Sequence, residues 1–402
     1  MSFSIRHYRK WLVFLLANVI CLSVLAKVGV SGLSCEYRVN PVGIGIENPR
    51  LSWKVVSDER NVLQSAYEIR VASTEEALRE GKDLLWNTGK ILSSQSVDIE
   101  YNGMALLPSQ RVFWQVRIWT GKEKTISWSD PAYWEMGLVD QQNWKASWIT
   151  SPADKPNETF RPCTYFRNEF RVEKQVKSAR LYASALGLYE IYLNGKKVGD
   201  QLFTPGWTSY KKRIQYQTYE VTGLLSGQNA LGAIVSDGWY RGFIGTNQNY
   251  YGNRTTLIAQ LQINYTDGTS EVIATDGSWK ASTGAILFSD IYHGEIFDAR
   301  LEPTEWNNSG FDDKDWKNAV ILDHPKDILI AQQGVPVKVI QEIHSINLFQ
   351  TPKGETIFDM GQNMVGHVRL KVNGKAGEKV VLKFAEVLDQ QGNFYTENLR
   401  TA

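Results

Sequence analysis

The stretch "YEIYLNGKKVGD", Tyr189 to Asp200, decides the fold class of this 402-residue chain. Apolar side chains alternate with polar ones up to the pair Asn194-Gly195, and such a period of two is typical of a half-buried β-strand. Asn-Gly is the preferred pair in a two-residue hairpin turn, where both positions need positive φ. The stretch therefore predicts a β-hairpin, and it raises the question of whether the turn also helps to hold a ligand.

The same alternation extends through the first third of the chain. "YEIRVAS" and "VFWQVRIWT" place Tyr67 and Trp114, with their alternate neighbours, on single faces of strands. About seven short strands separated by prolines and glycines are typical of a small β-sandwich. One short helix is expected in "STEEALREG", where Ser73 or Thr74 would cap it and Gly81 would end it.

The remaining chain divides into further β-units. We expect a fibronectin- or Ig-like sandwich over 27–140, a connector over 141–158 where prolines appear, and a second sandwich over 159–328. Asp267-Gly268 is a second hairpin signal there. From 329 to 402, alternation such as Val368, Leu370 and Val372 predicts that a third β-unit begins, which about 70 residues would leave incomplete. The fold class expected is all-β, as tandem sandwiches.

Composition and the N-terminus limit the class of protein. The net charge is +1 without long single-sign runs, which argues against nucleic acid as the partner. Residues 1–26 are typical of an export signal, with a basic start, an apolar core and a small-residue end at Ala26, so a periplasmic or extracellular location is expected. Cys21 suggests a lipid anchor, but Ile20 stands where a small residue is wanted. No segment after it is apolar enough for a membrane span.

Two cysteines, Cys35 and Cys163, follow the signal segment. They lie in different expected domains and are 128 positions apart in the sequence. We expect them to be unpaired thiols, although the compartment would permit one disulfide.

Several motifs in order make the sequence familiar. "YLNGKKVGD", "TPGWTSYKKRIQYQTYEVTGLL", "SDGWYRGFIG", "IYHGEIFDAR", "FDMGQNMVGHVRLKV" and "AEVLDQQGNFYTENLRTA" together resemble the N-terminal half of bacterial α-L-rhamnosidases, family 78 of the glycoside hydrolases. The resemblance covers roughly Leu33 to Ala402. "LNG" followed by "GWY" is also similar to the sugar-binding domain of family 2 β-glycosidases, which leaves an N-terminal fragment of such an enzyme as an alternative.

The resemblance implies an architecture and an activity. Its members carry a fibronectin-like domain, a jelly-roll carbohydrate-binding module that in some members binds L-rhamnose with calcium, and a concanavalin-like β-sandwich. A helical (α/α)6 barrel with an inverting pair of carboxylic acids then hydrolyses terminal α-L-rhamnosyl residues. This sequence departs from that pattern, because it ends before such a barrel would begin. We therefore expect no catalytic residue here, and a missing catalytic domain.

The expected role of the chain is recognition of a rhamnose-containing glycan. A sugar has hydroxyls and an apolar face, so its site needs an aromatic plate beside polar groups. The candidate residues of the second domain are Asn194, Glu190, Asp237, Trp239 and Tyr240.

The nearby loops also suit a calcium ion, although sugar binding would not require one. Calcium takes carboxylate and carbonyl oxygens, and the candidate ligands are Asp200 and Asn247. Trp207, which follows "PG", is expected in the core. A purely structural reading remains open for Asn194, since the hairpin alone explains it.

The best local acid pair, Glu295 and Asp298, is expected to serve ion pairing with Arg300 or ligand contact rather than hydrolysis, which needs two carboxyls across a sugar ring. The cluster Asp312, Asp313 and Asp315 is expected to be a solvated turn over Trp316. Two alternatives to a rhamnosidase part remain: a free-standing carbohydrate-binding protein for another sugar, and a structural remnant without a ligand.

Overall fold

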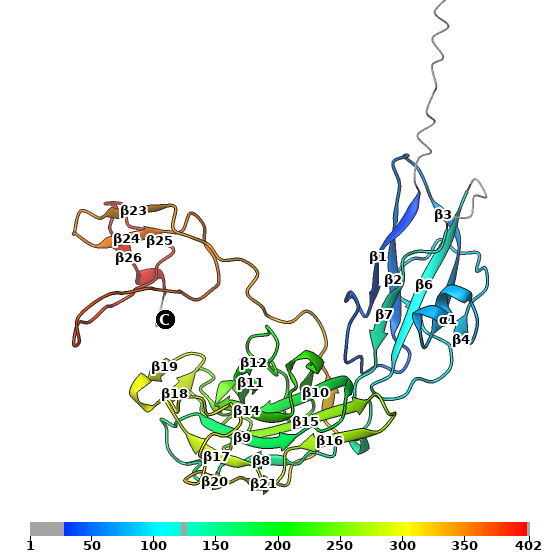
Figure 1. Ribbon diagram of the computed structural model, residues 1–402. Helices are drawn as coiled ribbons and strands as arrows, with labels where there is room; N and C mark the ends of the chain where they lie inside the picture. The colour runs from blue at the N-terminus through cyan, green and yellow to red at the C-terminus, as the bar shows by residue number, and fades with distance from the viewer. Residues whose placement is uncertain (1–27, 122–126, 400–402) are drawn as a thin grey trace, which may run out of the picture. The chain divides into compact units, whose positions relative to one another are not determined.

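The computed structural model describes residues 28–121 and 127–399 (Figure 1). The signal segment, with Cys21, lies outside them, so export and anchoring stay predictions. The chain forms two compact units, of which the first comprises most of residues 28–132 and the second holds 133–399 together with 40–49 and 105–111. Within the described residues, no helix has the length and apolar character needed to cross a membrane.

Residues 29–135, most of which belong to the first unit, form a two-sheet β-structure (Figure 1, blue to cyan). One sheet has the order β1-β2-β5 and the other β4-β3-β6-β7. Their bounds are β1 Gly29–Cys35, β2 Arg50–Val56, β3 Gln64–Ala72, β4 Leu84–Asn87, β5 Ile99–Glu100, β6 Arg111–Thr120 and β7 Ala132–Glu135.

The expected alternation is confirmed in β3 and β6, where Ile69, Val71, Val112 and Trp114 are buried. The expected helix is α1 (Glu75–Glu80), which Thr74 caps and Gly81 ends with φ of 68°.

The second unit contains a larger β-sandwich (Figure 1, green to yellow). Its first sheet runs β21-β8-β15-β10-β13-β22, with β16 paired to β15, and its second runs β12-β11-β14-β9-β17-β20. The first sheet comprises β8 Trp148–Thr150, β10 Val176–Leu186, β13 Ile214–Glu220, β15 Thr256–Tyr265, β16 Ser270–Ala274, β21 Val320–Leu322 and β22 Leu329–Ala331. The second comprises β9 Thr164–Arg171, β11 Leu188–Leu193, β12 Lys196–Lys197, β14 Gln228–Ser236, β17 Lys280–Thr283 and β20 Lys317–Asn318.

The register of β10 and β15 explains why this sandwich has two cores. Leu181 lies opposite Leu261, and both belong to the inner core together with Ile191 of the facing sheet. The intervening residues Tyr182 and Ile258 point to the other side and join a second cluster under the loops. Both faces of these strands are therefore buried. Each large apolar side chain that is fully buried stabilises the folded state by about 1.5–3 kcal/mol relative to its exposure to water.

The Asn194-Gly195 turn is confirmed as a hairpin between β11 and β12. Asn194 has φ of 52° and Gly195 of 77°, and Leu193 pairs with Lys196. Asp267-Gly268 likewise joins β15 to β16, with Gly268 at φ of 84°.

The connector expected over 141–158 is corrected in one respect, because it contributes β8 to the first sheet of the sandwich. Trp144, Ala146 and Trp148 are buried there. Similarly, β22 lies beyond the expected boundary at 328 and pairs in parallel with β13. The prolines at 152 and 156 obscured the short apolar strand that precedes them.

The segment after Val335 differs from the sandwich. It holds only short paired strands among its described residues, β23 Asn347–Gln350 with β24 Thr356–Asp359 and β25 Val387–Leu388 with β26 Phe394–Tyr395. The strand expected around Val368, Leu370 and Val372 is absent from the described chain, and these side chains are exposed. That expectation was wrong for a physical reason: alternation specifies a strand only where another strand and a core are present.

The remaining elements are short. They are the hairpin β18 Ile286–Asp290 with β19 Gly294–Phe297, the helix α2 Gly238–Arg241, and the 3-10 turns η1 Gln141–Asn143, η2 Thr222–Leu224, η3 Ala299–Leu301 and η4 Glu397–Leu399. Cys35 and Cys163 are buried, free thiols, as expected.

Candidate functional site

The candidate site begins where β14 ends and α2 follows at once. Gly238 has φ of 51°, and a Cβ there would lie 2.5 Å from Leu188 Cγ. Only glycine therefore lets α2 start so close to β11. This tight junction fixes Trp239 and Tyr240 at the end of a central strand of the sandwich.

An aromatic surface surrounds α2, and we define it by Phe203, Trp207, Trp239, Tyr250 and Tyr251. The indole rings of Trp207 and Trp239 are stacked, with centroids 5.6 Å apart and planes 8° from parallel. The ring centroid of Phe203 lies 5.9 Å from that of Trp239. Phe203 and Trp207 are each 49% exposed and Tyr250 is 57% exposed, so the surface presents aromatic faces to solvent.

The expectation that Trp207 lies in the core was wrong. Three residues later Tyr210 takes the buried place instead, at 2% exposure, and its hydroxyl donates to Gly206 O at 2.8 Å. Trp207 is left on the surface, where its Nε1 donates to the Tyr251 hydroxyl at 3.4 Å.

Tyr240 supports the aromatic surface from beneath. It is 7% exposed, its ring lies 5.4 Å from that of Tyr210, and Tyr210 in turn lies 5.0 Å from Tyr251. Burial raises the pKa of both Tyr210 and Tyr240. The structure thus gives Tyr240 a packing role, and its contact with a sugar stays a prediction.

Asp237 belongs to a buried charge network that sequence reasoning missed. Its carboxylate accepts from Arg241 Nε at 2.7 Å and lies 3.1 Å from Arg161 Nη2, and Arg241 also reaches Asp154 at 2.5 Å. The four side chains are each at most 4% exposed. Burial raises the pKa of Asp237, and Arg241 and Arg161 oppose that shift.

The network holds the loops that carry the aromatic surface. Arg161 Nη1 donates to Asn249 Oδ1 at 3.1 Å, beside Tyr250, and Asn249 N donates to Arg241 O at 2.9 Å. Asp237 therefore positions the surface, and its own oxygens are already engaged by two arginines. No periodicity in the sequence marks Asp154 or Arg161, since both lie in irregular chain.

Asn194 has its polar side-chain atoms satisfied within the fold. Its Nδ2 donates to Leu224 O at 2.9 Å and to Asn229 Oδ1 at 2.8 Å, and its Oδ1 accepts from Ala230 N at 2.9 Å. The structural reading of this residue therefore has direct support, while ligand contact by Asn194 stays untested.

Glu190 is exposed on β11 and already has two partners. It accepts from the Tyr192 hydroxyl at 2.6 Å and pairs with Lys197. Its charge adds to burial in raising the pKa of Glu295 on β19. Glu190 is available to solvent, and no contact places it within the aromatic surface.

The two proposed calcium ligands do not by themselves form a cation site. The Asp200 carboxylate pairs with Lys338 Nζ at 2.9 Å, and Asn247 lies in an exposed turn with Ile244. In residues 28–121 and 127–399, no group of three or more His, Cys, Asp and Glu is placed to hold a metal. Calcium prefers six to eight oxygen ligands, so this pair does not fit it without further donors.

The acids named from sequence serve structure. Hydrogen bonds from Arg300 hold the pKa of Asp298 at about 2, so Asp298 stays ionised as the expected ion pair. Asp312 pairs with Lys314 and Asp313 with Arg167, above the buried Trp316, which confirms the solvated turn. The aromatic surface itself offers stacking and hydrogen bonding.

Comparison with known proteins gives three family matches in sequence order. Residues 30–140 match the Rha78A-like N-terminal immunoglobulin domain, residues 174–341 the α-L-rhamnosidase N-terminal domain, and residues 349–402 the bacterial α-L-rhamnosidase concanavalin-like domain. An α-L-rhamnosidase from Alteromonas sp. is 40% identical over 91% of this chain, which spans 41% of that relative.

Solved structures agree with the sequence matches. The Streptomyces avermitilis α-L-rhamnosidase complexed with L-rhamnose is 30% identical, with a TM-score of 0.85 over 93% of this chain and 53% of that one. The Aspergillus terreus enzyme is 35% identical, with a TM-score of 0.83 over 94% and 43%. This chain thus spans about half or less of the length of the relatives it matches.

The Streptomyces avermitilis relative is also longer within the matched range. Its sequence alignment runs over 548 positions, against 379 for the Alteromonas relative, although the two cover similar shares of this chain. The Streptomyces protein therefore carries an additional segment that this chain lacks.

Proposed function

Because the chain belongs to the α-L-rhamnosidase family, of whose members it spans the N-terminal part, we propose that it recognises the glycan on which such an enzyme acts. Such an enzyme hydrolyses the linkage of a terminal α-L-rhamnosyl residue, so the proposed ligand of this chain is a glycan that carries one. The observation that carries the proposal is the half-exposed Trp207 stacked on the partly buried Trp239, with Phe203 beside them.

The chemistry of rhamnose suits this aromatic surface. A 6-deoxy sugar has a methyl group in place of a hydroxymethyl, so one side of its ring is unusually apolar and stacks well on indole or phenyl faces. The Tyr250 and Tyr251 hydroxyls border the rings and provide hydrogen bonds to sugar hydroxyls. The buried network of Asp237, Arg161 and Arg241 keeps these loops in place before the ligand arrives, which reduces the entropy lost on binding.

We propose that residues 1–402 bind the glycan without cleaving it. Asp298, Asp312 and Asp313 are engaged in ion pairs, and the family resemblance assigns hydrolysis to a helical barrel outside the matched range. Incubation with p-nitrophenyl α-L-rhamnoside tests this directly. Release of p-nitrophenol above the blank would contradict it.

Binding is tested by saturation-transfer NMR with methyl α-L-rhamnoside. Trp207→Ala should weaken binding about tenfold, because it removes one of the two stacked faces. Phe297→Ala is the matched control, since Phe297 is similarly exposed, at 53%, but lies on β19. Equal loss in both variants, or no loss in either, would reject the aromatic surface as the site.

The same titration tests the remaining parts of the proposal. Repeating it with a chelator tests calcium, for which Asp200→Ala is the matching variant and unchanged binding argues against a bound ion. A panel that includes galactose and glucose separates rhamnose recognition from a carbohydrate-binding protein of another specificity.

Export, proposed from residues 1–26, is tested by sequencing the N-terminus of protein recovered from the culture medium or periplasm.

A further inference from the structure

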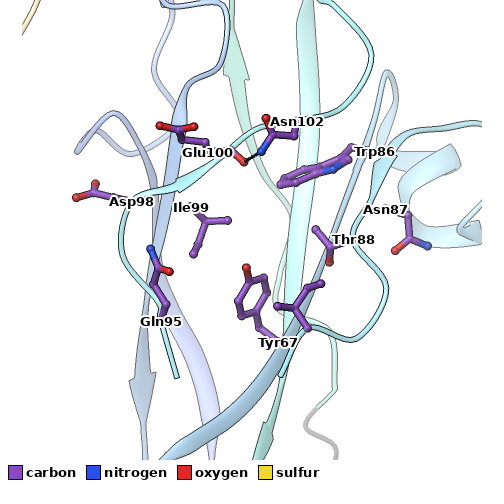
Figure 2. A pocket seen from close by; sticks show the side chains of 10 residues that line it. Tyr67, Trp86, Asn87, Thr88, Gln95, Asp98, Ile99, Glu100 and Asn102 are labelled. Carbon is purple, nitrogen blue, oxygen red and sulfur yellow. Dashed lines mark hydrogen bonds between the residues drawn. The ribbon is translucent and has the colours of Figure 1, made fainter. Parts of the chain in front are cut away.

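The first domain contains a hollow that the glycan site of the second domain does not involve. It has a volume of about 590 Å³, which lies in the usual range for small-ligand sites. Figure 2 shows its walls, which come from β3, β4, β5 and the loop 88–98. The lining residues are Tyr67, Trp86, Asn87, Thr88, Ile91, Gln95, Asp98, Ile99, Glu100 and Asn102.

Aromatic and apolar side chains line part of the hollow. Trp86 forms one wall and Ile99 lies across from it (Figure 2). Trp86 is half-buried and is held by an edge contact with Tyr101, the ring centroids being 5.3 Å apart at 77°. Trp53 holds Tyr67 in the same way, at 5.3 Å. Both aromatic side chains are therefore fixed before any ligand binds.

The Tyr67 hydroxyl points into this apolar space, as Figure 2 shows. Tyr67 is 7% exposed and lines the hollow. Burial raises the pKa of Tyr67, so the group stays protonated and is able to donate as well as accept. A polar group placed in an apolar site fixes the orientation of a ligand.

The rim of the hollow is polar and acidic. Glu100 contributes an exposed carboxylate, whereas the Asp98 carboxylate is directed toward Tyr37, and no Lys, Arg or His is among the ten lining residues. One amide N–H of Gln95 donates to Val97 O and one of Asn102 to Glu100 O, which leaves both amide carbonyl oxygens as acceptors. A ligand that donates several hydrogen bonds and carries no negative charge fits this rim best.

We propose that this hollow is a second carbohydrate site, which binds a neutral sugar ring. Trp86 stacks on the apolar face of the ring, Tyr67 hydrogen-bonds a hydroxyl directed inward, and Glu100 and Asn102 accept from hydroxyls at the rim. Uronic acids and sulfated sugars are disfavoured by the Glu100 carboxylate. The proposal is independent of the aromatic surface, because each site lies within a different compact unit.

The test measures saturation transfer to neutral and acidic monosaccharides in a Trp207→Ala background, in which the glycan site of the second domain is weakened about tenfold. L-rhamnose, galactose and glucose are the neutral probes, and galacturonic acid is the charged control. Trp86→Ala and Tyr67→Phe are then added singly. Trp119→Ala, another half-buried tryptophan of the same domain, is the matched control. Circular dichroism melting verifies that each variant folds.

We expect at least one neutral sugar to retain binding in the Trp207→Ala background. Adding Trp86→Ala should weaken it about tenfold, and Tyr67→Phe about three- to tenfold, with no change for Trp119→Ala. Binding that survives Trp86→Ala, binding of galacturonic acid as tight as that of galactose, or no neutral sugar bound by the folded Trp207→Ala protein would each overturn the proposal. Loss of the second-domain site alone leaves these outcomes unaffected.

Discussion

The inner strands of the second-domain sandwich and the segment 360–386 both alternate apolar with polar residues. The apolar side chains are buried in the sandwich and exposed in the segment. In β10, Leu181 and its alternate neighbours are fully buried between two sheets. In the later segment, Val368 and Leu370 alternate just as regularly, yet they are 52% and 43% exposed, and Val365 is wholly exposed. Alternation specifies which face of a strand is apolar, whereas burial depends on a second sheet to cover that face.

The largest effect is expected from breaking the buried charge network. Arg241→Met leaves Asp154 and part of Asp237 without their partner in a buried setting, which should destabilise the second domain by about 3–5 kcal/mol. Arg369→Met removes an exposed pair with Glu342 and should change stability by less than about 0.5 kcal/mol. Urea unfolding followed by circular dichroism measures both. Similar losses would show that the two regions are equally ordered.

A smaller but still large difference is expected for leucine truncation. Leu181→Ala opens a cavity opposite Leu261 and should cost about 2–5 kcal/mol. Leu370→Ala, in the exposed segment, has no core to disturb and should cost less than about 0.5 kcal/mol. The denaturation midpoints of the two variants give the comparison. A loss above about 1 kcal/mol at Leu370 would mean that it is buried in solution.

Proteolysis compares the two regions without substitution. Lys371 and Lys383 lie in chain without assigned strands, whereas Arg180 lies on β10 and is buried. Trypsin should therefore cut at the two lysines well before it cuts at Arg180, because cleavage requires local opening of the chain. Mass spectrometry of timed digests identifies the sites. Early cleavage at Arg180 would contradict the structure of the sandwich.

The smallest effect expected is a pH dependence from His324. Burial lowers the pKa of His324, the nearby Asp323 opposes that shift, and its ring lies 5.5 Å from that of the buried Trp148. A depressed histidine pKa gives stability that is fully present above the unfolded pKa and is lost as the pH falls through the folded one. The second domain should therefore lose stability below about pH 6.5, and His324→Gln should flatten that slope. Thermal melts from pH 8 to 5 measure it, and equal slopes would reject the assignment.

The sequence predicts hairpins well where a turn pair lies between two alternating segments that pair with each other. Asn194-Gly195 and Asp267-Gly268 turn as expected, because the positive φ values they allow are a local property. Trp207 and Tyr210 show the limit. Both are aromatic and three residues apart, and only the placement of the loop over the first sheet of the sandwich decides which one is buried.

Of the candidate site, too, the sequence predicted the part that depends on local signals and missed the part that depends on long-range contacts. Trp239 lies on the aromatic surface, as its position beside Gly238 suggested. Asp237 pairs with Arg161, and Asp154 shares Arg241 with it; Arg161 and Asp154 are more than 70 positions away in sequence and belong to irregular chain. Long-range charge pairs of this kind leave no periodic signal, so no local pattern reveals that the carboxylate is already occupied.

The chain passes between its two compact units more than once, since residues 40–49 and 105–111 group with the second unit although their neighbours belong to the first. Gly45 shows how closely this segment fits, because a Cβ there would lie 2.6 Å from Ala331 Cβ. Exchange of the first domain by recombination at a single junction near 140 would thus import foreign loops into a fitted surface. Relatives that differ over residues 40–49 should then show matching changes around Ala331, because both belong to the second unit.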